Sequence, residues 1–556
     1  MESGKVTFQP SNLPAFSITF PAMDRGLVRH TLDQLAAVLA FKGEDPLRVR
    51  ELQHAARSEL LATGRSSTLD ELREQVPPGL VEMLRIPGLG VAKVRRIHQA
   101  LAIESLAELE AAAADGRLAA LPRFGTRTAE SVRRGIASLR TSGLRLFHHA
   151  LDESAAVQRA LAGLDGVLRV EIAGAVRRHC EVIEQLNLVV VHAGGGARKA
   201  LITGLSHAPG VTELAGEEGA ITLRFASGSV VDVWLTTPER FGIDWIRATG
   251  SAAHLAGLES RARAAGASLA GKFADESSVY EALGLPWVPP ELREGEGELE
   301  AAARGALPHL VQQGDLRGFL HCHTNYSDGT VTVREWAEAC RAAGYQWVGI
   351  TDHSKSAAFT GGLKSEDVAR QHAEIDDLNA SGAGIRVLKG VEADILADGS
   401  LDYGSDVLDR FDFVIGSIHS RFGMSEAEMT GRVLAAMDDP HLAILGHPTG
   451  RLLLQREPYA IDLERVLTKA AARGVAVEVN ADPHRLDLDW RMVRRARQLG
   501  VAISIGADAH STSGMANVAA GLGIARKGWV EPAHVLNTRP VEEFLMFASG
   551  RRSRAA

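Results

Sequence analysis

The 556-residue chain has only three cysteines and no long apolar run. Three cysteines cannot build a disulfide framework, which favours a reducing, cytoplasmic location. No apolar run reaches about 18 residues, so we expect no membrane-spanning helix and no membrane partner. The N-terminal stretch MESGKVTFQPSNLPAF lacks a basic segment followed by an apolar one. It therefore does not predict a secretory signal.

The chain also lacks an excess of positive charge. Its formal net charge is −8, which argues against general affinity for nucleic acid along the whole chain. The C-terminal half is rich in aspartate, glutamate and histidine, however, so the total could mask a basic front half. A chain of this length is expected to form roughly three to five domains.

Hydrophobic spacing divides the chain into three kinds of structure. After an extension at 1–26 without a clear period, residues 28–150 show helical spacing punctuated by glycine. Runs rich in β-branched residues at 167–172, 188–192, 221–225 and 230–235 predict an α+β segment. The Pro/Glu/Gly-rich stretch 285–298 predicts a boundary or tether. Beyond Leu316, seven short apolar strands alternate with helices, which predicts an α/β barrel.

Two similar glycine-containing turns occur in the helical region. They are Ile86-Pro-Gly-Leu-Gly-Val-Ala-Lys93 and Leu121-Pro-Arg-Phe-Gly-Thr-Arg-Thr-Ala129. Each combines an apolar residue, a glycine turn and a helix start, which is the helix-hairpin-helix arrangement. Glycine lets the backbone approach a phosphate, and the amides of a helix start face its charge. The predicted DNA-contacting residues are Gly88, Gly90, Lys93, Arg96, Gly125 and Arg127. The alternative is two ordinary helix turns with solvated basic faces.

Imidazole and carboxylate side chains follow successive strands of the predicted barrel. Because functional sites of such barrels lie at the carboxyl ends of the strands, this pattern predicts a metal site. Mixed imidazole and carboxylate ligation suits Mn²⁺, Zn²⁺ or iron better than Mg²⁺ alone. The predicted ligands are His321, His323, Asp328, Asp352, His353, Glu392, His419, His447, Asp508 and His510.

Some of these residues carry more specific expectations. His321 and His323 are two residues apart and would share one face of a strand. With Asp328, Glu392 and Asp508, they are predicted to act in catalysis through bound metal, which acidifies water; the resemblance of this half to the PHP family of metal-dependent phosphoesterases implies that this water attacks phosphorus. Arg451 and Arg485 are expected to hold phosphate oxygens, and Asn480 to position substrate or water. For these last three, loop-stabilising hydrogen bonds are the alternative.

The order of these parts resembles the bacterial family X DNA polymerases. The resemblance implies a helical 8-kDa-like domain with the first hairpin (27–100), a fingers-like segment with the second (101–150), a polymerase-β-like palm (151–240), a thumb-like segment (241–298), a linker (299–315) and a PHP metallophosphoesterase domain (316–556). It further implies a distorted (β/α)7 barrel with up to three ions, Mn²⁺ and/or Zn²⁺. The implied partner is DNA with gaps, single strands or 3′ ends, and we expect a monomer.

The nucleotidyl-transfer site of that family is only partly present. Nucleotide-binding positions that match are Gly174, Arg178, Asp232, Gly250 and Ser251. The family's paired palm aspartates fall on Gln185 and Asn187, and the base-contacting asparagine falls on Leu255. Two neighbouring cations need anionic oxygens to offset their repulsion, so we do not expect a Mg²⁺ pair in the palm. The family's Schiff-base lysine falls on Arg96, which stays protonated.

The leading hypothesis is therefore a DNA repair protein that acts mainly as a metal-dependent 3′-5′ exonuclease. Its polymerase-like half would bind gapped or end DNA. Three alternatives remain open. The chain could be a gap-filling DNA polymerase, with dependence on Mn²⁺ left open; a small-molecule phosphomonoesterase of the histidinol-phosphatase type; or a non-catalytic module that binds DNA ends.

Overall fold

The computed structural model describes residues 88–555, apart from short gaps at 102, 104, 123, 141–142, 209–210, 217–219, 226–228 and 358–359. It also describes residues 39, 49–52, 80, 83–84 and 86. The predicted extension at 1–26 and most of the helical stripe that follows it lie outside these residues. The chain divides into two compact units. The first comprises residues 1–143, 154–172 and 187–238, and the second comprises 144–153, 173–186 and 239–556.

The helical part of the first unit contains α5 (Val91–Leu101), α6 (Leu106–Ala114) and α7 (Thr126–Arg140). Helix α6 begins with a capping box between Ser105 and Glu108, which satisfies free amides of the first turn. The three helices share one apolar core, which includes Val94, Ile97 and Leu109. We expected the region 28–150 to be all helical, but Arg145–Leu146 forms strand β1.

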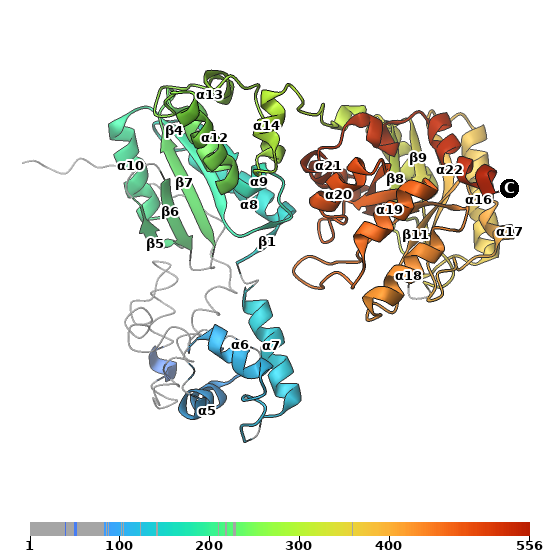
Figure 1. Ribbon diagram of the computed structural model, residues 1–556, viewed down its shortest axis with the longest axis horizontal. Coiled ribbons are helices and arrows are strands. Elements are labelled where there is room, and N and C mark those ends of the chain that lie inside the picture. Colours follow the sequence, from blue (N-terminus) through green and yellow to red (C-terminus); the bar gives the residue numbers. More distant parts are fainter. Residues whose placement is uncertain are drawn as a thin grey trace, which may run out of the picture. The chain divides into compact units, whose positions relative to one another are not determined.

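A five-stranded sheet forms the other part of the first unit (Figure 1). Its strand order is β2-β4-β7-β6-β5. The strands are β2 (Val167–Ala173), β4 (Leu186–His192), β5 (Val211–Ala215), β6 (Ala220–Phe225) and β7 (Val230–Thr236). Helix α10 (Gly195–Ser206) follows β4. The predicted strands correspond to β2, β4, β6 and β7, whereas β5 was not predicted.

The second unit begins with short helices and strands from the predicted palm and the residues just before it. They are β1, the start of α8 (Phe147–Ala162), α9 (Gly174–Arg177) and β3 (Val182–Ile183), with β1 and β3 antiparallel. The thumb-like helices follow as α11 (Phe241–Thr249), α12 (Ala252–Ala264), α13 (Glu276–Ala282) and α14 (Glu298–Ala303). The stretch 285–298 is not a tether, because Leu285, Val288 and Leu292 are buried in the thumb core. Leu310, from the predicted linker 299–315, packs into the same core.

The seven predicted barrel strands close into one parallel barrel, in the order β10-β11-β12-β13-β14-β8-β9 (Figure 1). Every residue of β8 through β13 except Arg386 and Lys389 is buried, as expected for parallel strands covered by helices. The strands are β8 (Gly318–Cys322), β9 (Trp347–Ile350), β10 (Arg386–Asp394), β11 (Phe413–Ser417), β12 (Leu442–Leu445), β13 (Ala476–Asn480) and β14 (Ile503–Ala509).

Amphipathic helices surround the barrel. Helix α15 shows how their sequence positions them: Thr332 and Glu335 form its capping box, while Val333, Trp336 and Cys340 are buried. The helices are α15 (Val333–Ala342), α16 (Ser365–Ala380), α17 (Ser405–Leu408), α18 (Glu426–Ala436), α19 (Leu463–Arg473), α20 (Trp490–Gln498), α21 (Val518–Lys527) and α22 (Val541–Ala555). Among the described residues, no helix is long and apolar enough to span a membrane.

Candidate metal centre

Histidine and carboxylate side chains meet at the carboxyl ends of the barrel strands. Three overlapping groups could each hold a metal ion, with ligand atoms within 4.8 Å of one another. The first contains His323, Asp328, His353 and His510; the second contains His321, His323 and Asp508; and the third contains His353, Glu392 and His419. Because His323 and His353 each belong to two groups, the three groups form one continuous cluster.

Glu392, near the end of β10, lies at the centre of this cluster. Its Oε1 is 2.9 Å from His447 Nε2, 3.4 Å from His321 Nε2 and 3.4 Å from His419 Nε2. Its other oxygen, Oε2, is 2.9 Å from His353 Nδ1. Each oxygen thus faces a different set of imidazoles, which is the arrangement required of a carboxylate that bridges two cations.

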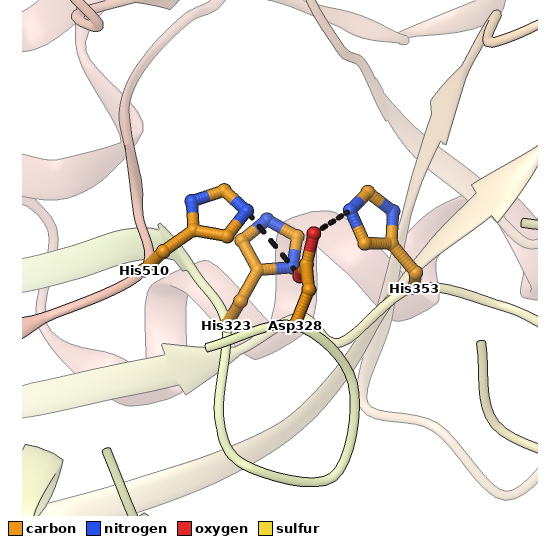
Figure 2. A group of neighbouring side chains, drawn as sticks. All are labelled: His323, Asp328, His353 and His510. Atoms are coloured by element: carbon orange, nitrogen blue, oxygen red, sulfur yellow. Dashed lines mark ion pairs between the residues drawn. The ribbon is translucent and has the colours of Figure 1, made fainter. Parts of the chain in front are cut away.

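Asp328 connects the loop after β8 with the ends of two other strands. Figure 2 shows its carboxylate between the rings of His353 and His510. Its oxygens lie 3.6 Å from His353 Nε2 and 3.3 Å from His510 Nε2. The ring of His323 is stacked against both imidazoles, with centroid distances of 4.4 and 4.3 Å. This group is the most exposed part of the cluster, with the His510 side chain 40% exposed.

Three of the predicted ligands have unusual backbone conformations near the ends of their strands. His321, His447 and Asp508 have φ values of 60°, 21° and 48°, a region that non-glycine residues rarely occupy and that is common at functional sites. The β14–β8 register also shifts between Gly506 and Ala509. His321 and His323 nevertheless lie in the same group, as their spacing predicted, although His323 lies just beyond the end of β8.

Several nitrogen and oxygen atoms in the cluster are buried without a hydrogen bond to any described residue. They include His321 Nε2, both ring nitrogens of His323, and Glu392 Oε2. Buried polar atoms are normally satisfied, and a coordinating cation is one explanation for such exceptions. The donor set of imidazoles and carboxylates fits Mn²⁺ or Zn²⁺. The residues present are therefore suited to hold the implied metal ions.

The pKa values of the cluster residues support the same interpretation. Burial alone would lower the pKa of His353, but Glu392 and Asp328 raise it to about 10. Burial likewise opposes the charged form of His419, yet Glu392 and Asp394 raise its pKa to about 9. Burial favours the neutral form of Glu392, whereas the surrounding imidazoles hold its pKa well below the usual range. Cations replace such protons when they bind imidazole ligands.

Asp352 lies outside the three groups, so its role as a ligand stays a prediction. Its Oδ1 accepts hydrogen bonds from Thr324 N at 2.7 Å and Ser327 Oγ at 2.5 Å. Its Oδ2 accepts from Thr324 Oγ1 at 2.6 Å and Gln371 Nε2 at 2.5 Å. With these donors around it, the carboxylate fixes the loop that carries Asp328.

Arg451, Asn480 and Arg485 differ in their relation to the cluster. The Arg451 side chain donates to the carbonyls of Arg485 and Leu486. It lines a cavity of about 340 Å³ whose walls include none of the predicted ligands. Asn480 Nδ2 donates to Asp508 Oδ2 at 3.0 Å, and Arg485 Nε lies 3.4 Å from the same oxygen. Arg451 therefore makes stabilising hydrogen bonds, which were the alternative to phosphate binding. Asn480 and Arg485 contact the predicted ligand Asp508.

Two carboxylates that support the cluster were not predicted. Asp394 Oδ1 accepts from His419 Nδ1, and Glu478 Oε1 accepts from His321 Nδ1, each at 2.5 Å. Both lie on buried strands, β10 and β13. A charged residue inside an apolar strand, as in Val475-Ala-Val-Glu-Val, was a signal that could have identified Glu478.

The two predicted hairpins differ in what their residues contact. Gly88 has φ +84°, so its turn requires glycine, whereas Gly90 and Gly125 have ordinary φ values. Lys93 Nζ donates to the Gly88 carbonyl at 2.8 Å, and Arg96 Nη1 donates to the Pro122 carbonyl at 3.3 Å. These contacts hold the first turn and join it to the second hairpin. Arg127, at the start of α7, is exposed.

Comparison with known proteins supports this arrangement of parts. Family models match residues 80–137 as a "SAM-like Helix-hairpin-helix tandem", residues 245–294 as "DNA polymerase beta thumb" and residues 320–482 as "PHP domain". The chain is 31% identical over 558 residues to "DNA polymerase/3'-5' exonuclease PolX" of Bacillus subtilis, covering 93% of this chain and 98% of that protein. This chain belongs to the family X DNA polymerases that carry a PHP domain. It also resembles a "Probable phosphatase" of Syntrophotalea carbinolica, with 33% identity over 100 residues, or 17% of this chain and 39% of that protein.

In this family X chain, the arginines of the nucleotide-binding motif are paired with thumb carboxylates. Arg177 forms two hydrogen bonds to Glu276, at 2.6 and 2.9 Å, and Arg293 forms two more to the same carboxylate. Arg178 Nε lies 2.8 Å from Glu294 Oε1, which also accepts from Lys527. These ion pairs occupy the guanidinium groups of Arg177 and Arg178, which would otherwise be available to bind a triphosphate.

Other predicted nucleotide-binding residues have structural contacts. Ser251 caps α12 by accepting from His254 N at 3.1 Å, and Gly250 ends α11. Leu255 packs against the thumb core. In the sheet of the first unit, Asp232 Oδ1 accepts from Thr222 Oγ1 at 2.7 Å. Gly174 has φ +65° at the start of α9.

Proposed function

We propose that this family X protein acts mainly as a metal-dependent 3′-5′ exonuclease through its PHP barrel. The observation that carries the proposal is the cluster of His321, His323, Glu392 and their neighbours, in which buried ligand atoms lack hydrogen bonds to described residues. In the proposal, Mn²⁺ and/or Zn²⁺ is held by the members of the three overlapping groups, with His447 beside Glu392. Such ions acidify bound water toward neutral pH and offset charge on the phosphate oxygens.

The protein's own groups have distinct roles in this proposal. Glu392 separates two sets of imidazoles and holds them at opposite oxygens. Asp328 and His510, on the exposed side of the cluster, are closest to an incoming phosphodiester. Arg485, whose side chain is 18% exposed, is positioned beside Asp508 to contact a phosphate oxygen. The 3′-5′ polarity is proposed from the similarity to the Bacillus subtilis DNA polymerase/3'-5' exonuclease PolX.

DNA is the proposed substrate because of the front half. The helix-hairpin-helix match spans both glycine turns, and such turns bind the phosphate backbone without reading sequence. The thumb match and the full-length similarity to a DNA polymerase/exonuclease support the same substrate class. We therefore propose that the front half presents gapped, single-stranded or 3′-ended DNA to the barrel.

A nuclease assay tests the proposal. Full-length protein is incubated with Mn²⁺ and a 5′-labelled primer annealed to a template, and the products are compared with those of His323→Ala. His309→Ala is the control, because His309 is exposed and lies outside the cluster. Wild type and His309→Ala should shorten the primer from its 3′ end, and His323→Ala should not. Equal degradation by all three proteins would refute the proposal.

Gap-filling polymerisation is the second candidate function. It is favoured by Asp232, which remains on β7 beside the strand β4 that carries Asn187. Primer extension by wild type that disappears in Asp232→Ala would support it. A phosphomonoesterase activity, favoured by similarity to probable phosphatases, would appear as hydrolysis of a phosphorylated small molecule without degradation of DNA.

A further inference from the structure

Glu478 is a charged residue completely buried in the barrel. It lies on β13 between two valines, and its exposed fraction is 0%. A buried carboxylate is unfavourable unless hydrogen-bond donors or opposite charges surround it. It belongs to none of the three metal-binding groups. Its partners therefore indicate why the barrel contains it.

Both oxygens of Glu478 contact the cluster. Oε1 accepts from His321 Nδ1 at 2.5 Å, and Oε2 accepts from the His447 backbone N–H at 2.7 Å. Oε2 also accepts from Asn480 Nδ2 at 3.2 Å, and that same nitrogen donates to Asp508 Oδ2 at 3.0 Å. Glu478 thus joins β13 directly to His321 on β8 and to His447 after β12. Through Asn480 it is also joined to Asp508 on β14.

The contact with His321 determines how that imidazole meets a cation. When Nδ1 carries the hydrogen donated to Glu478, Nε2 has its lone pair available. His321 Nε2 is buried without a hydrogen bond to a described residue, and it lies 3.6 Å from Asp508 and 3.4 Å from Glu392. The ring is thus held in the orientation and tautomer that a ligand requires.

The neighbouring strand makes room for this arrangement. A Cβ atom at Gly506 would lie 1.8 Å from Glu478 Oε1 and 3.0 Å from the His321 Cβ. Any larger residue would displace the carboxylate from His321. Gly506 is therefore needed for the contact between Glu478 and His321.

His419 has the same kind of support from a different strand. Its Nδ1 is 2.5 Å from Asp394 Oδ1, and its Nε2 faces Glu392 Oε1 at 3.4 Å. By contrast, His510 Nδ1 contacts a backbone carbonyl, that of Asp508, at 3.1 Å. The two carboxylate-supported imidazoles both present Nε2 to the same oxygen of Glu392, on the buried side of the cluster.

We infer that Glu478 is a positioning residue. It fixes His321, and through Asn480 also Asp508, so that the group of His321, His323 and Asp508 can bind a metal ion. Asp394 performs the corresponding role for His419. This inference rests on the proposed metal-dependent function but concerns residues outside the ligand set. Loss of an orienting partner of this kind typically lowers metal affinity about 10–100-fold.

The test compares Glu478→Gln with wild type in the full-length chain. Glutamine keeps the size of the side chain but removes its charge. The control is Glu464→Gln, because Glu464 is an acidic residue on barrel helix α19 with a side chain 54% exposed. Mn²⁺ affinity and stoichiometry are measured by titration calorimetry, and the ligand field by absorption of the Co²⁺-substituted protein. Circular dichroism establishes that each variant is folded.

The expected result is a loss of Mn²⁺ affinity by about 10–100-fold in at least one site of Glu478→Gln, with an altered Co²⁺ spectrum. Excess Mn²⁺ should restore primer degradation, and the KM for DNA should stay unchanged. Asp394→Asn should weaken Mn²⁺ binding in the same way, which provides a second measurement if Glu478→Gln does not fold. Unchanged affinity and spectrum in a folded variant would overturn the inference while leaving the nuclease proposal intact. A wild-type protein that binds no Mn²⁺ would overturn both.

Discussion

The nucleotide-binding motif and the barrel cluster differ in how their charges are satisfied. In the motif, Arg177 and Arg178 form close pairs with Glu276 and Glu294. In the cluster, His321 Nε2 and both ring nitrogens of His323 are buried without a hydrogen bond to a described residue. Direct hydrogen bonds already satisfy the arginines of the motif, whereas buried ring nitrogens of this kind remain for a ligand to satisfy. The difference supports a structural role for the first site and the proposed metal chemistry for the second.

Removal of metal should produce the largest difference between the two sites. A chelator should reduce nuclease activity more than about a thousandfold, because the proposed hydrolysis depends on metal-activated water. Binding at a hundred times Kd stabilises a domain by about 2.7 kcal/mol per site, so chelation should also lower the melting temperature of the barrel by roughly 5–10 °C. Activity and thermal unfolding with EDTA, then with added Mn²⁺, measure both effects. Full activity after complete removal of metal would contradict this view of the cluster.

Glu276→Gln should chiefly affect stability. Burial opposes the charged form of Glu276, but Arg293 and Arg177 lower its pKa from 4.5 to about 2. A shift of this size corresponds to roughly 3 kcal/mol. Because the folded-state pKa is lowered, this stabilisation is present above pH 4.5 and is lost as the pH falls toward 2. Urea unfolding of variant and wild type between pH 7 and pH 2.5 should show a difference that shrinks in the acid range.

The control for this change is Glu281→Gln, at an exposed position on the same helix. It should leave the free energy of unfolding within about 0.5 kcal/mol of wild type. A Glu276→Gln protein as stable as wild type at pH 7 would show that the arginine pairs are not structural. The arginines would then be available for a triphosphate.

Asp352→Asn distinguishes support of a loop from metal ligation. In either orientation the amide NH2 would face a donor, Thr324 N at the Oδ1 position or Gln371 Nε2 at the Oδ2 position, so we expect a loss of about 1–3 kcal/mol of stability. The number of bound Mn²⁺ ions should not change, whereas His353→Asn should reduce it. Metal analysis of the two purified variants measures this difference. Loss of an ion from Asp352→Asn would place Asp352 in the ligand set.

The smallest expected effect concerns the hairpins. Arg127→Ala should weaken binding to a gapped duplex by about three- to tenfold and reduce the salt slope by about one. Glu130→Gln, on the same helix, should not weaken binding. Fluorescence anisotropy at several salt concentrations measures both variants. An unchanged affinity and slope in Arg127→Ala would favour two ordinary helix turns.

Much of the barrel could be predicted from sequence because six of its seven strands, all but β13, carry a predicted ligand or are soon followed by one. Apolar runs placed all seven strands, and His321, Glu392 and Asp508 fall where strand ends meet. The motif around Asp352 contains a neighbouring ligand, His353, but spacing does not reveal that Thr324 and Gln371 enclose the aspartate. Side-chain direction at a loop depends on such tertiary partners.

Contacts between distant segments were equally inaccessible from sequence. Arg177 and Glu276 are 99 positions apart, and His321 and Glu478 are 157 apart. No local period connects such pairs. The missing palm aspartates at Gln185 and Asn187 were visible in the sequence, but the pairing of the retained arginines required the fold.

We propose that this polymerase architecture hydrolyses DNA more than it synthesises it. One labelled gapped duplex, incubated with the wild-type protein, Mn²⁺ and all four deoxynucleoside triphosphates, tests this proposal. Wild type should shorten the primers from the 3′ end, and His323→Ala should leave them intact. Primers extended across the gap by wild type, but not by Asp232→Ala, would refute the proposal.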